Sequence, residues 1–399
     1  YITLIPQFLR RKIVHIRIKI NNIKLNIDII RSRKRHKKLI SELTEKKIIN
    51  VVFLVIHHAI WKYEEVYRLL NNDSKFNVKV VIIPLVNDGK EDMKTYNQTL
   101  NYFVSSGYST LSSYNQKNDS WIDIKKTTDP DIVFFTNPHR LTFDKYYINE
   151  FKDRLTCYVP YAFVVIHTIE GHYNQNIHHL LWKYFVETKY HRAFAKLYSK
   201  KRVNNIVVSG YPSLDVIYRK NFIPKPSWKV TNSKTIKIIW APHHTIEGQG
   251  NNLDYSSFFD YSNFFLTLLY NRKDIQIAFK PHPLLREKLY IDSKWGKEKT
   301  DNYYSSWNKL SNGQLEDGPY IDLFSHSDAM ITDSASFIAE YLYFNKPLCF
   351  TMKDNNVKNR FNSFGKMIFD YLYTSNDSLS TEFFINNVII DKNDYLKES

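Results

Sequence analysis

The chain has 399 residues. Because a single domain usually holds about 100 to 200 residues, this length predicts two domains. Hydrophobic residues make up 43% of the chain, among them 29 Tyr and 26 Phe. This is the composition of a globular protein, and the large aromatic side chains suit both cores and ligand sites. The longest apolar run, residues 48–56, is broken by Asn50 and falls short of the roughly 18 residues that a membrane-spanning helix needs.

The chain has two cysteines, Cys157 and Cys349. They lie far apart in the sequence and match neither a metal-binding spacing nor a disulfide framework, so both are expected to be buried, reduced thiols. This cysteine usage predicts a cytoplasmic protein. The chain begins with Tyr1 and not with Met, which leaves open whether an upstream segment or anchor is missing.

The positive charge is concentrated near the N-terminus. The net charge is +16, and residues 1–48 alone hold 14 Lys and Arg against 3 acidic residues, a net +11. The densest part is a run of basic residues: Arg31, Arg33, Lys34, Arg35, His36, Lys37 and Lys38. It follows Ile20, Ile23, Ile27 and Ile30, which share one face of a helix. This pattern is typical of a basic helix that lies on an anionic membrane surface.

The same N-terminal segment fits a second interpretation. Ile23, Leu25, Ile27 and Ile29 also alternate, so a strand beside a solvated charge run fits the pattern equally well. No zinc-ligand pattern, RNA-binding aromatic motif or recognition-helix signature accompanies the charge. The sequence therefore leaves helix and strand open for residues 1–48 and predicts no nucleic-acid partner.

Beyond residue 48, short β-branched runs alternate with amphipathic stretches. Residues 61–70 form the clearest predicted helix, because Tyr63, Val66, Tyr67 and Leu70 recur at three- and four-residue steps. The predicted strands are residues 51–56, 79–83, 131–136, 156–159 and 206–208. This alternation predicts a Rossmann-like domain with a parallel sheet over residues 49–225.

A second series follows a linker-like stretch. Residues 221–233 carry Pro224, Pro226 and Ser227 between periodic segments, which places the domain boundary at residue 225. The predicted elements beyond it are strands at 235–240, 275–280, 329–332 and 348–352, with helices at 255–270, after Pro283 and from Ser334. The fold class is therefore α/β, with two Rossmann-like domains whose parallel sheets face a cleft. This is the GT-B architecture, with a donor-nucleotide domain at 226–399 and an acceptor domain before it.

Polar residues gather where the predicted strand 329–332 ends. Ser334 stands at the N-cap of the following helix and Ser336 in its first turn, where free backbone N–H groups and the helix dipole favour a phosphate. Asp333 is placed to accept from hydroxyl groups of a donor or to orient a neighbour. Glu340, two turns into the helix, is placed to reach toward the cleft or into solvent. Plain N-capping explains the pattern without a ligand.

Histidines follow two further predicted strands. In Lys280-Pro-His-Pro283, two prolines hold His282 on a rigid turn beside Lys280, where an imidazole can donate to a phosphoryl oxygen or exchange a proton near neutral pH. His243 and His244 follow Trp240-Ala-Pro, and one of the two is expected to act as a proton acceptor or phosphate ligand, because neighbours in an extended turn point apart. The alternative for each is an ordinary structural or surface histidine.

A weaker pattern lies in the first domain. In His167-Thr-Ile-Glu-Gly-His172, Glu170 between two histidines predicts an acid–base pair on the acceptor side, with ordinary polar packing as the alternative. The spacing does not match the His-Glu-x-x-His zinc motif, and Asp129-Pro-Asp131 precedes a strand instead of ending one, so no metal site is predicted. With 10 Gly and neither a phosphate loop nor a Gly-x-Gly-x-x-Gly fingerprint, kinases and dehydrogenases are not favoured.

Taken together, the motifs resemble the CDP-glycerol glycerophosphotransferase family of teichoic-acid and capsule enzymes. They agree with it in order and spacing: Gly210-Tyr-Pro-Ser-Leu-Asp215, Trp240-Ala-Pro242, Lys280-Pro-His-Pro283, and Ile331-Thr-Asp-Ser-Ala-Ser336 with Lys346-Pro347. The resemblance covers about residues 160–355, and its specificity comes from the combination of short pieces. It implies a GT-B transferase, peripheral at the inner face of the bacterial membrane, that moves a polyol phosphate from a CDP-polyol to a growing surface polymer.

The family's functional residues carry over unevenly. His282 matches the family's essential C-terminal histidine, and Asp333, Ser334 and Ser336 match its Asp-x-Ser-Ser donor loop; Glu340 stands where many members have Asp. The family's Trp-His-Gly-Thr-Pro motif, which supplies its other essential histidine, is absent. The corresponding stretch reads Tyr158-Val-Pro-Tyr-Ala-Phe163. This departure leaves His167, His172 and His244 as candidates for the general base.

The predicted reaction is transfer of glycerol phosphate or ribitol phosphate from a CDP-polyol to a lipid-linked or oligosaccharide acceptor, with release of CMP. His282, Lys280 and the helix start at Ser334 would stabilise the phosphate charge, and no cofactor is expected. The alternative is a GT-B glycosyltransferase that uses a nucleotide sugar in capsule, O-antigen or cell-wall polysaccharide synthesis. A non-catalytic binding module is disfavoured, because such a module needs no proton acceptor.

Overall fold

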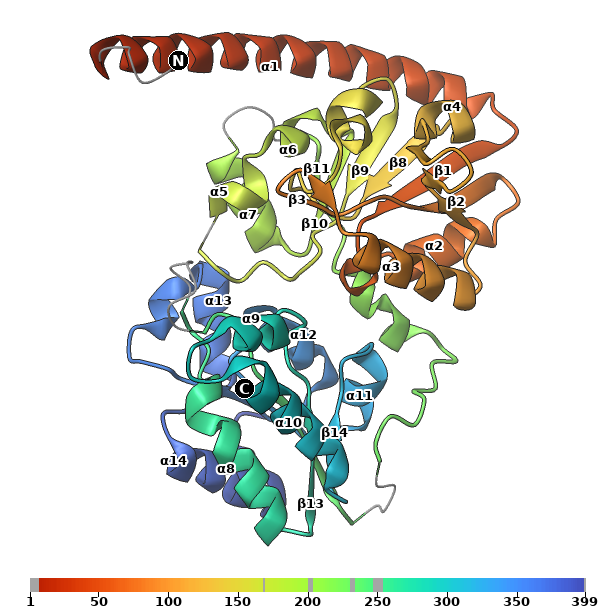
Figure 1. Cartoon of the computed structure of the whole chain (residues 1–399). Coiled ribbons are helices and arrows are strands. Elements are labelled where there is room, and N and C mark those ends of the chain that lie inside the picture. Colours follow the sequence, from red (N-terminus) through yellow and green to blue (C-terminus); the bar gives the residue numbers. More distant parts are fainter. Residues whose placement is uncertain (1–6, 168, 200–203, 230–233, 247–253, 398–399) are drawn as a thin grey trace. The chain divides into compact units, whose positions relative to one another are not determined.

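The computed structural model describes residues 7–397, apart from residues 168, 200–203, 230–233 and 247–253. The chain divides into two compact units (Figure 1). Unit 1 comprises Tyr1–Ala162 and Thr168–Val216, and unit 2 comprises Phe163–His167 and Ile217–Ser399. The junction after Val216 precedes the stretch 221–233 that the sequence marks as a linker.

Unit 1 is built on a seven-stranded, fully parallel sheet in the order β11-β10-β9-β8-β1-β2-β5. Its strands are β1 (Ile49–Val55), β2 (Phe76–Ile82), β5 (Thr110–Ser112), β8 (Ile132–Phe135), β9 (Leu155–Tyr158), β10 (Lys183–Val186) and β11 (Ile206–Val208). The five predicted strands of this domain are confirmed as β1, β2, β8, β9 and β11. The sequence missed β5, Thr-Leu-Ser, and β10, Lys-Tyr-Phe-Val, which have no run of β-branched residues like the Ile-Val-Val of β11.

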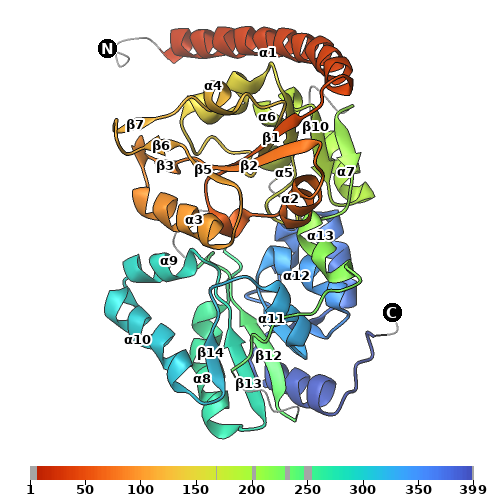
Figure 2. The same ribbon diagram turned by 90° about the vertical axis from the view of Figure 1, so that its right-hand side faces the viewer.

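The helices of unit 1 lie on both faces of this sheet, with α2 and α3 on one face and α1 and α4 on the other (Figure 2). They are α1 (Gln7–Thr44), α2 (Glu64–Asn71), α3 (Met93–Ser105), α4 (Ile124–Thr128), α5 (Ile169–Tyr173), α6 (Asn176–Leu180) and α7 (Lys189–Tyr198). Two short antiparallel pairs stand apart from the main sheet: β3 (Val86–Asn87) with β4 (Lys90–Glu91), and β6 (Tyr114–Asn115) with β7 (Ser120–Trp121). The helix predicted at 61–70 is confirmed as α2.

The core of unit 1 is aromatic and holds the carboxyl ends of the strands in place. Phe53 of β1 stacks on Phe134 of β8, with ring centroids 4.7 Å apart. The buried Tyr63 hydroxyl donates to the carbonyl of Phe135 at 2.7 Å and accepts from the amide of Val159 at 2.7 Å. Since both bonds are buried, Tyr63 ties the ends of β8 and β9 together.

The basic N-terminal segment is one long helix, α1, which runs along unit 1 (Figure 1). Of the two sequence interpretations, the helix is confirmed and the strand is wrong. Ile29, Ser32 and His36 are buried, whereas an exposed stripe runs along the helix: Ile13, Ile16, Ile20, Ile23, Ile27 and Ile30, which are 39% to 59% exposed. None of the described helices combines the length and apolar character that crossing a bilayer requires.

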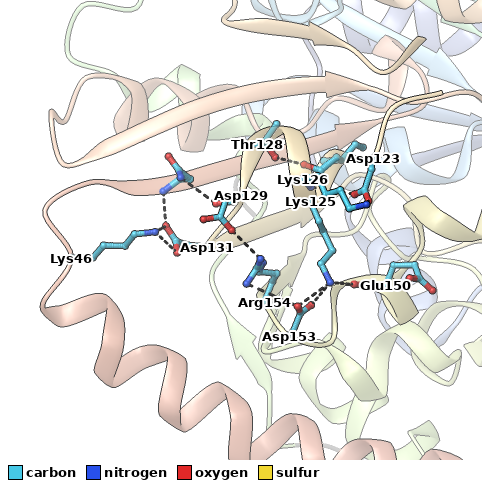
Figure 3. Close-up of polar contacts among 12 residues, drawn as sticks. Lys46, Asp123, Lys125, Lys126, Thr128, Asp129, Asp131, Glu150, Asp153 and Arg154 are labelled. Carbon is cyan, nitrogen blue, oxygen red and sulfur yellow. Dashed lines mark hydrogen bonds and ion pairs between the residues drawn. The ribbon is translucent and has the colours of Figure 1, made fainter. Parts of the chain in front are cut away.

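An ion pair attaches the turn that follows α1 to the sheet of unit 1, at the amino ends of its strands (Figure 3). The Asp131 carboxylate accepts from Lys46 Nζ at 2.6 and 2.7 Å and from the backbone amide of Asn50 at 2.8 Å. Asp129 pairs with Arg154 at 3.0 Å. The Asp-Pro-Asp sequence therefore joins β1 to the start of β8 and holds the turn that follows α1, in agreement with its place before a strand.

Unit 2 is built on a six-stranded, fully parallel sheet in the order β14-β13-β12-β15-β16-β17. Its strands are β12 (Ile236–Ala241), β13 (Ile275–Phe279), β14 (Gly313–Leu315), β15 (Ala329–Thr332), β16 (Leu348–Thr351) and β17 (Tyr373–Ser375). The four predicted strands are confirmed as β12, β13, β15 and β16. The sequence missed β14 and β17, each of which has three residues.

The helices of unit 2 also cover both faces of the sheet, with α8 and α10 on one side and α11 and α12 on the other (Figure 2). They are α8 (Phe258–Asn271), α9 (Leu285–Ile291), α10 (Gly296–Lys309), α11 (Ile321–His326), α12 (Ala335–Tyr341), α13 (Ser363–Ile368) and α14 (Ser378–Phe383), followed by a π-helical turn, Phe384–Ile390. The three predicted helices are confirmed as α8, α9 and α12.

The tryptophan of the Trp-Ala-Pro motif is a core residue. Trp240 is 1% exposed, and its ring centroid lies 4.6 Å from that of Phe265 and 5.0 Å from that of Phe279. Cys157 in unit 1 and Cys349 in unit 2 are free and buried, and burial raises the pKa of both thiols. The prediction that both cysteines are buried is confirmed.

The segment Phe163–His167 belongs to unit 2, although unit 1 surrounds it in the sequence, and it pairs with the loop before α13. Ile166 and Phe361 form an antiparallel bridge, and the Asn362 side chain donates to the carbonyl of Val164 at 2.9 Å. At Gly365 a Cβ atom would lie 2.4 Å from the carbonyl oxygen of Val165, so only glycine permits this approach.

Candidate functional site

The strand order of unit 2 creates a ligand position at one edge of its sheet. From β12 the chain proceeds through β13 and β14 on one side, and then through β15, β16 and β17 on the other. The order therefore reverses between β12 and β15. In open parallel sheets, ligands bind at such a switch point, beyond the carboxyl ends of the strands. We call the residues that follow β12, β13 and β15 the rim of unit 2.

Three histidines meet at this rim. His243 and His244 follow β12, and His282 follows β13. The ring centroid of His244 lies 4.2 Å from that of His243 and 4.2 Å from that of His282, while those of His243 and His282 are 4.8 Å apart. All three side chains are half-buried. The structure thus brings together histidines that the sequence assigned to two separate strand ends.

The proton of His282 has a defined position. Its Nδ1 accepts from the backbone amide of Leu284 at 3.1 Å, and its own amide donates to the carbonyl of Pro242 at 3.0 Å. A neutral imidazole has one N–H, and a nitrogen that accepts carries no proton, so the proton lies on Nε2. His282 therefore offers a hydrogen-bond donor at Nε2, which suits a phosphoryl oxygen.

The histidines of the rim are neutral near pH 7. Burial lowers the pKa of His282 and His243 well below its usual value, and the neighbouring histidine and Lys288 lower it further. Burial, followed by the charge of Lys288, lowers the pKa of His244 to about 4. A neutral imidazole can accept or donate a hydrogen bond without the cost of a buried charge. The Nδ1 of His244 is buried without a hydrogen-bond partner among the described residues.

Asp333 holds the histidine loop in place. Its side chain is 1% exposed, and Oδ1 accepts from the backbone amide of His243. Oδ2 accepts from the amide and hydroxyl of Ser257 at 2.6 and 2.8 Å and from the hydroxyl of Ser256 at 3.3 Å. Burial raises the pKa of Asp333 to about 6, against these hydrogen bonds, which lower it. Of the two predicted roles, orienting a neighbour is the one that this geometry supports.

The sequence did not point to the residues that surround His243 and Asp333. The Tyr255 hydroxyl lies 3.3 Å from His243 Nε2, and the Thr245 hydroxyl 3.2 Å from His243 Nδ1. Ser256 donates to the carbonyl of His243 at 2.8 Å. A serine pair directly before the apolar helix α8 was the available signal, because Ser257 is the residue that precedes its first turn.

The serines at the start of α12 have different surroundings. Ser334 is the N-cap residue, as predicted, but its hydroxyl makes no capping bond, and its backbone amide donates to the Thr332 hydroxyl at 2.9 Å. Ser334 is 6% exposed, whereas Ser336 in the first turn is half-buried. Ser336 is therefore the more accessible of the two predicted phosphate-side hydroxyls.

Two predicted phosphate-side residues, Lys280 and Glu340, make hydrogen bonds within unit 2. Lys280 is 7% exposed, and its ammonium donates to the carbonyls of Gly318 at 2.7 Å and Glu316 at 3.3 Å. Glu340 is 1% exposed and accepts from the Tyr320 hydroxyl, so the expectation that it reaches into solvent is wrong. A residue on the buried face of a short helix finds its partner inside the unit.

The two histidines of the first-domain pattern belong to different units, His167 to unit 2 and His172 to unit 1. His167 is exposed, and its Nδ1 and backbone amide contact the carbonyl of Arg360 at 2.7 and 3.0 Å. His172 lies in α5 of unit 1, where burial and the nearby His139 lower its pKa to about 4. Glu170 belongs to the same helix, but its side chain lies outside the described residues.

The histidine cluster also has the composition of a metal site. The ligand nitrogens of His243, His244 and His282 all lie within 4.8 Å of one another. A search of the described residues for three or more histidines, cysteines or acids close enough to share a metal ion finds this cluster. Imidazole nitrogen suits zinc and other divalent transition metals. The sequence spacing alone predicts no such site.

Residues 168–385, more than half of the chain, match the family described as CDP-glycerol:poly(glycerophosphate) glycerophosphotransferase. The chain belongs to this family. The match includes the three rim histidines, Asp333 and the first turn of α12, and it confirms the resemblance that the sequence motifs indicate.

The chain is also similar in sequence to a curated protein, the teichoic acid ribitol-phosphate polymerase TarL of Staphylococcus aureus (strain NCTC 8325 / PS 47). It is 23% identical over 184 residues, which are 42% of this chain and 30% of the polymerase. The match thus spans less than a third of that relative.

Two solved structures are similar in fold to this glycerophosphotransferase-family chain. A variant of the wall teichoic acid polymerase TagF has a TM-score of 0.58 at 13% identity and covers 98% of this chain and 91% of its own. The MnaA–UDP structure from S. aureus has a TM-score of 0.54 at 14% identity and covers 88% and 90%. At these identities the likeness concerns the fold alone, and it confirms the predicted GT-B class.

Proposed function

We propose that this protein is a CDP-polyol phosphotransferase, which moves glycerol phosphate or ribitol phosphate from a CDP-polyol to a lipid-linked or oligosaccharide acceptor. The observation that carries the proposal is the histidine rim of unit 2, in a chain of the glycerophosphotransferase family. His282 offers a fixed Nε2–H donor there, next to two further neutral imidazoles. Such groups stabilise the charge of a transferring phosphoryl group without covalent chemistry.

In the proposed reaction, a hydroxyl oxygen of the acceptor attacks the phosphorus atom that bears the polyol. A new phosphorus–oxygen bond forms, and the bond from this phosphorus to the bridging oxygen breaks. CMP leaves with that bond's electron pair, and the acceptor's proton passes to a base. His282 donates to a phosphoryl oxygen, Ser336 and the start of α12 contact the diphosphate, and His244 is the candidate proton acceptor within unit 2.

The stretch Tyr158-Val-Pro-Tyr-Ala-Phe163, which stands where the family has Trp-His-Gly-Thr-Pro, favours a second candidate. A GT-B glycosyltransferase that uses a nucleotide sugar would need no histidine at this place. The two reactions differ in the bond that they make, because only the polyol-phosphate transfer leaves a phosphodiester in the product. Released CMP is consistent with both and does not separate them.

We expect the purified full chain to form a new phosphodiester when it is incubated with CDP-glycerol or CDP-ribitol and a lipid-linked or oligosaccharide acceptor. The measurement is phosphorus NMR of the product, with reactions that lack acceptor or contain boiled protein as controls. Consumption of a nucleotide sugar without a phosphodiester resonance would identify a glycosyltransferase instead.

We also propose that α1 places the protein peripherally on an anionic membrane, at the inner face of the bacterial membrane. The exposed isoleucine stripe repeats at three- and four-residue steps, which also suits a coiled coil. However, the positions that flank this stripe are basic and exposed: Lys12, Lys19, Lys24, Arg31 and Arg33. In a coil of identical chains these like charges would repel, whereas they favour an anionic surface.

Replacing Ile16, Ile20 and Ile23 together by Ser should weaken binding to anionic vesicles at least about tenfold, because each side chain loses apolar burial in the interface. Vesicle co-sedimentation at two salt concentrations measures this. Ile223→Ser is the matched control, since Ile223 is 83% exposed and lies outside α1. Unchanged vesicle binding, together with loss of self-association in ultracentrifugation, would show that the stripe is a coiled-coil seam.

A further inference from the structure

The two sheets share the same construction at their switch points. In unit 1 the order reverses between β1 and β8, as it does between β12 and β15 in unit 2. At the amino ends, Asp131 accepts from the Asn50 amide at 2.8 Å, and Asp328 accepts from the Lys237 amide at 2.7 Å. These bonds join the first strand of each unit to its partner across the switch point in the same way.

The carboxyl ends of these strand pairs also correspond. The Thr136 hydroxyl, directly after β8, donates to the carbonyl of Leu54 in β1 at 2.9 Å. The Thr332 hydroxyl, at the end of β15, donates to the carbonyl of Ala241 in β12 at 2.6 Å. The ligand-binding edge of unit 1 is therefore located by the same geometry that locates the rim of unit 2.

A pair of adjacent histidines follows the first strand in both units. His57 and His58 come directly after Ile56 in unit 1, as His243 and His244 come after Pro242 in unit 2. The rings of His57 and His58 stack with centroids 4.6 Å apart, and both are half-buried. No sequence motif drew attention to this pair, and the reaction proposed for the rim of unit 2 does not use it.

His57 is fixed in the same way as His282. Its Nδ1 accepts from the backbone amide two residues further on, that of Ala59, at 2.9 Å, whereas His282 accepts from Leu284 at 3.1 Å. The proton of the neutral ring therefore lies on Nε2 in both residues. Two histidines, one in each unit, thus carry a preorganised Nε2–H donor at a switch point.

The surroundings of the His57–His58 pair indicate what kind of group it would bind. The ring of His58 stacks on Tyr102 of α3 with centroids 5.0 Å apart. Burial lowers the pKa of His57 to about 4, with His58 adding to this and Asp92 opposing it. Burial also lowers the pKa of His58, so the pair is uncharged near pH 7. The Asp92 carboxylate caps α3 through the amide of Thr95 at 3.0 Å. Neutral N–H donors beside an aromatic face suit hydroxyl-bearing groups.

We propose that His57 and His58 bind the hydroxyl-bearing polyol end of the acceptor, with His57 Nε2–H donating to an acceptor oxygen and the His58–Tyr102 stack packing against the polyol carbons. This inference rests on the proposed phosphotransferase function and assigns the acceptor contact of unit 1, where the family's histidine motif is absent.

The test is steady-state kinetics of the full chain with CDP-glycerol and a short poly(glycerol phosphate) acceptor. His57→Ala should raise the acceptor KM about tenfold or more, as expected for one lost hydrogen bond, while the donor KM stays within about twofold. Hydrolysis of CDP-glycerol by water without acceptor should be unchanged. His57→Gln keeps an N–H donor near the Nε2 position and should recover most of the acceptor affinity. His326→Ala in α11 is the control histidine and should change neither KM.

An unchanged acceptor KM in folded His57→Ala, or a change confined to the donor KM, would overturn the proposal. If His57→Ala does not fold, the same comparison is made with His57→Gln and with Tyr102→Leu, which removes the stacking partner of His58. If the wild type consumes no CDP-glycerol, the phosphotransferase function is wrong. Direct binding of poly(glycerol phosphate), measured by calorimetry, then decides the site by itself. Binding that His57→Ala weakens tenfold supports it, and equal or absent binding overturns it.

Discussion

His282→Ala should lower polyol-phosphate transfer about 100- to 1,000-fold, the usual effect of removing one preorganised donor that stabilises developing charge. The fold should remain, because His282 is half-buried at the rim and the turn is held by its backbone bond to Pro242 at 3.0 Å. The initial rate of phosphodiester formation measures activity, and circular dichroism and the melting temperature report on folding.

Two conservative variants separate the turn from the chemistry at His282. Asn can still accept from the Leu284 amide but has no donor at the Nε2 position, so His282→Asn should be as inactive as the Ala variant. Gln places an N–H donor near Nε2 and should keep part of the activity. A loss of only two- or threefold in all three variants would mean that His282 is a structural residue.

The sequence predicted the rim of unit 2 because its signals are local. β12 and β15 consist mostly of apolar, buried residues, so the sequence shows where each strand ends and which polar residues follow it. Two prolines fix the turn that presents His282. The strands that were missed contain polar residues or glycine and have no run of β-branched residues, unlike the equally short β11, Ile-Val-Val.

The roles of the rim residues could not be predicted, because their partners are distant in sequence. Asp333 meets Ser257 and His243, which lie 76 and 90 residues before it, so its use as an internal acceptor is a tertiary property. Glu340 finds Tyr320 through the packing of α12 against the turn before α11. The correspondence of His57 with His282 also needs both sheets, since the two local sequences share nothing beyond a histidine.

Asp333→Asn should impair both stability and transfer. The Asn amide can accept at one position only, and its NH2 group would face backbone N–H donors that now share the carboxylate, leaving at least one buried donor without an acceptor. Since hydrogen bonds to a charged group contribute most, the free energy of unfolding should fall by about 3 kcal/mol. Transfer should fall with it, because Asp333 holds the backbone of His243 in place.

Asp328→Asn is the matched control. Asp328 lies at the opposite end of the same strand, is exposed, and accepts from the Lys237 amide at 2.7 Å. Its loss should cost about 1 kcal/mol or less, and transfer should be unaffected. Urea unfolding of both variants gives the comparison. Equal destabilisation by the two substitutions would show that the four donors around Asp333 contribute no more to the free energy of unfolding than the single donor at Asp328.

The acid limb of the pH–rate profile should belong to Asp333. Because burial raises its pKa to about 6, the carboxylate takes up a proton as pH falls through that value, and an oxygen that accepted from a backbone amide becomes a donor facing it. Transfer by the wild type should therefore fall about tenfold per pH unit below pH 6. The rim histidines do not produce this limb, since the pKa of His244 is lowered to about 4 and those of His243 and His282 are held well below the usual value. Asp333→Asn has no proton to gain there, so its low activity should be flat between pH 5 and 7. If that variant keeps an acid limb near pH 6, another group controls the profile, and the raised pKa of Asp333 has no part in catalysis.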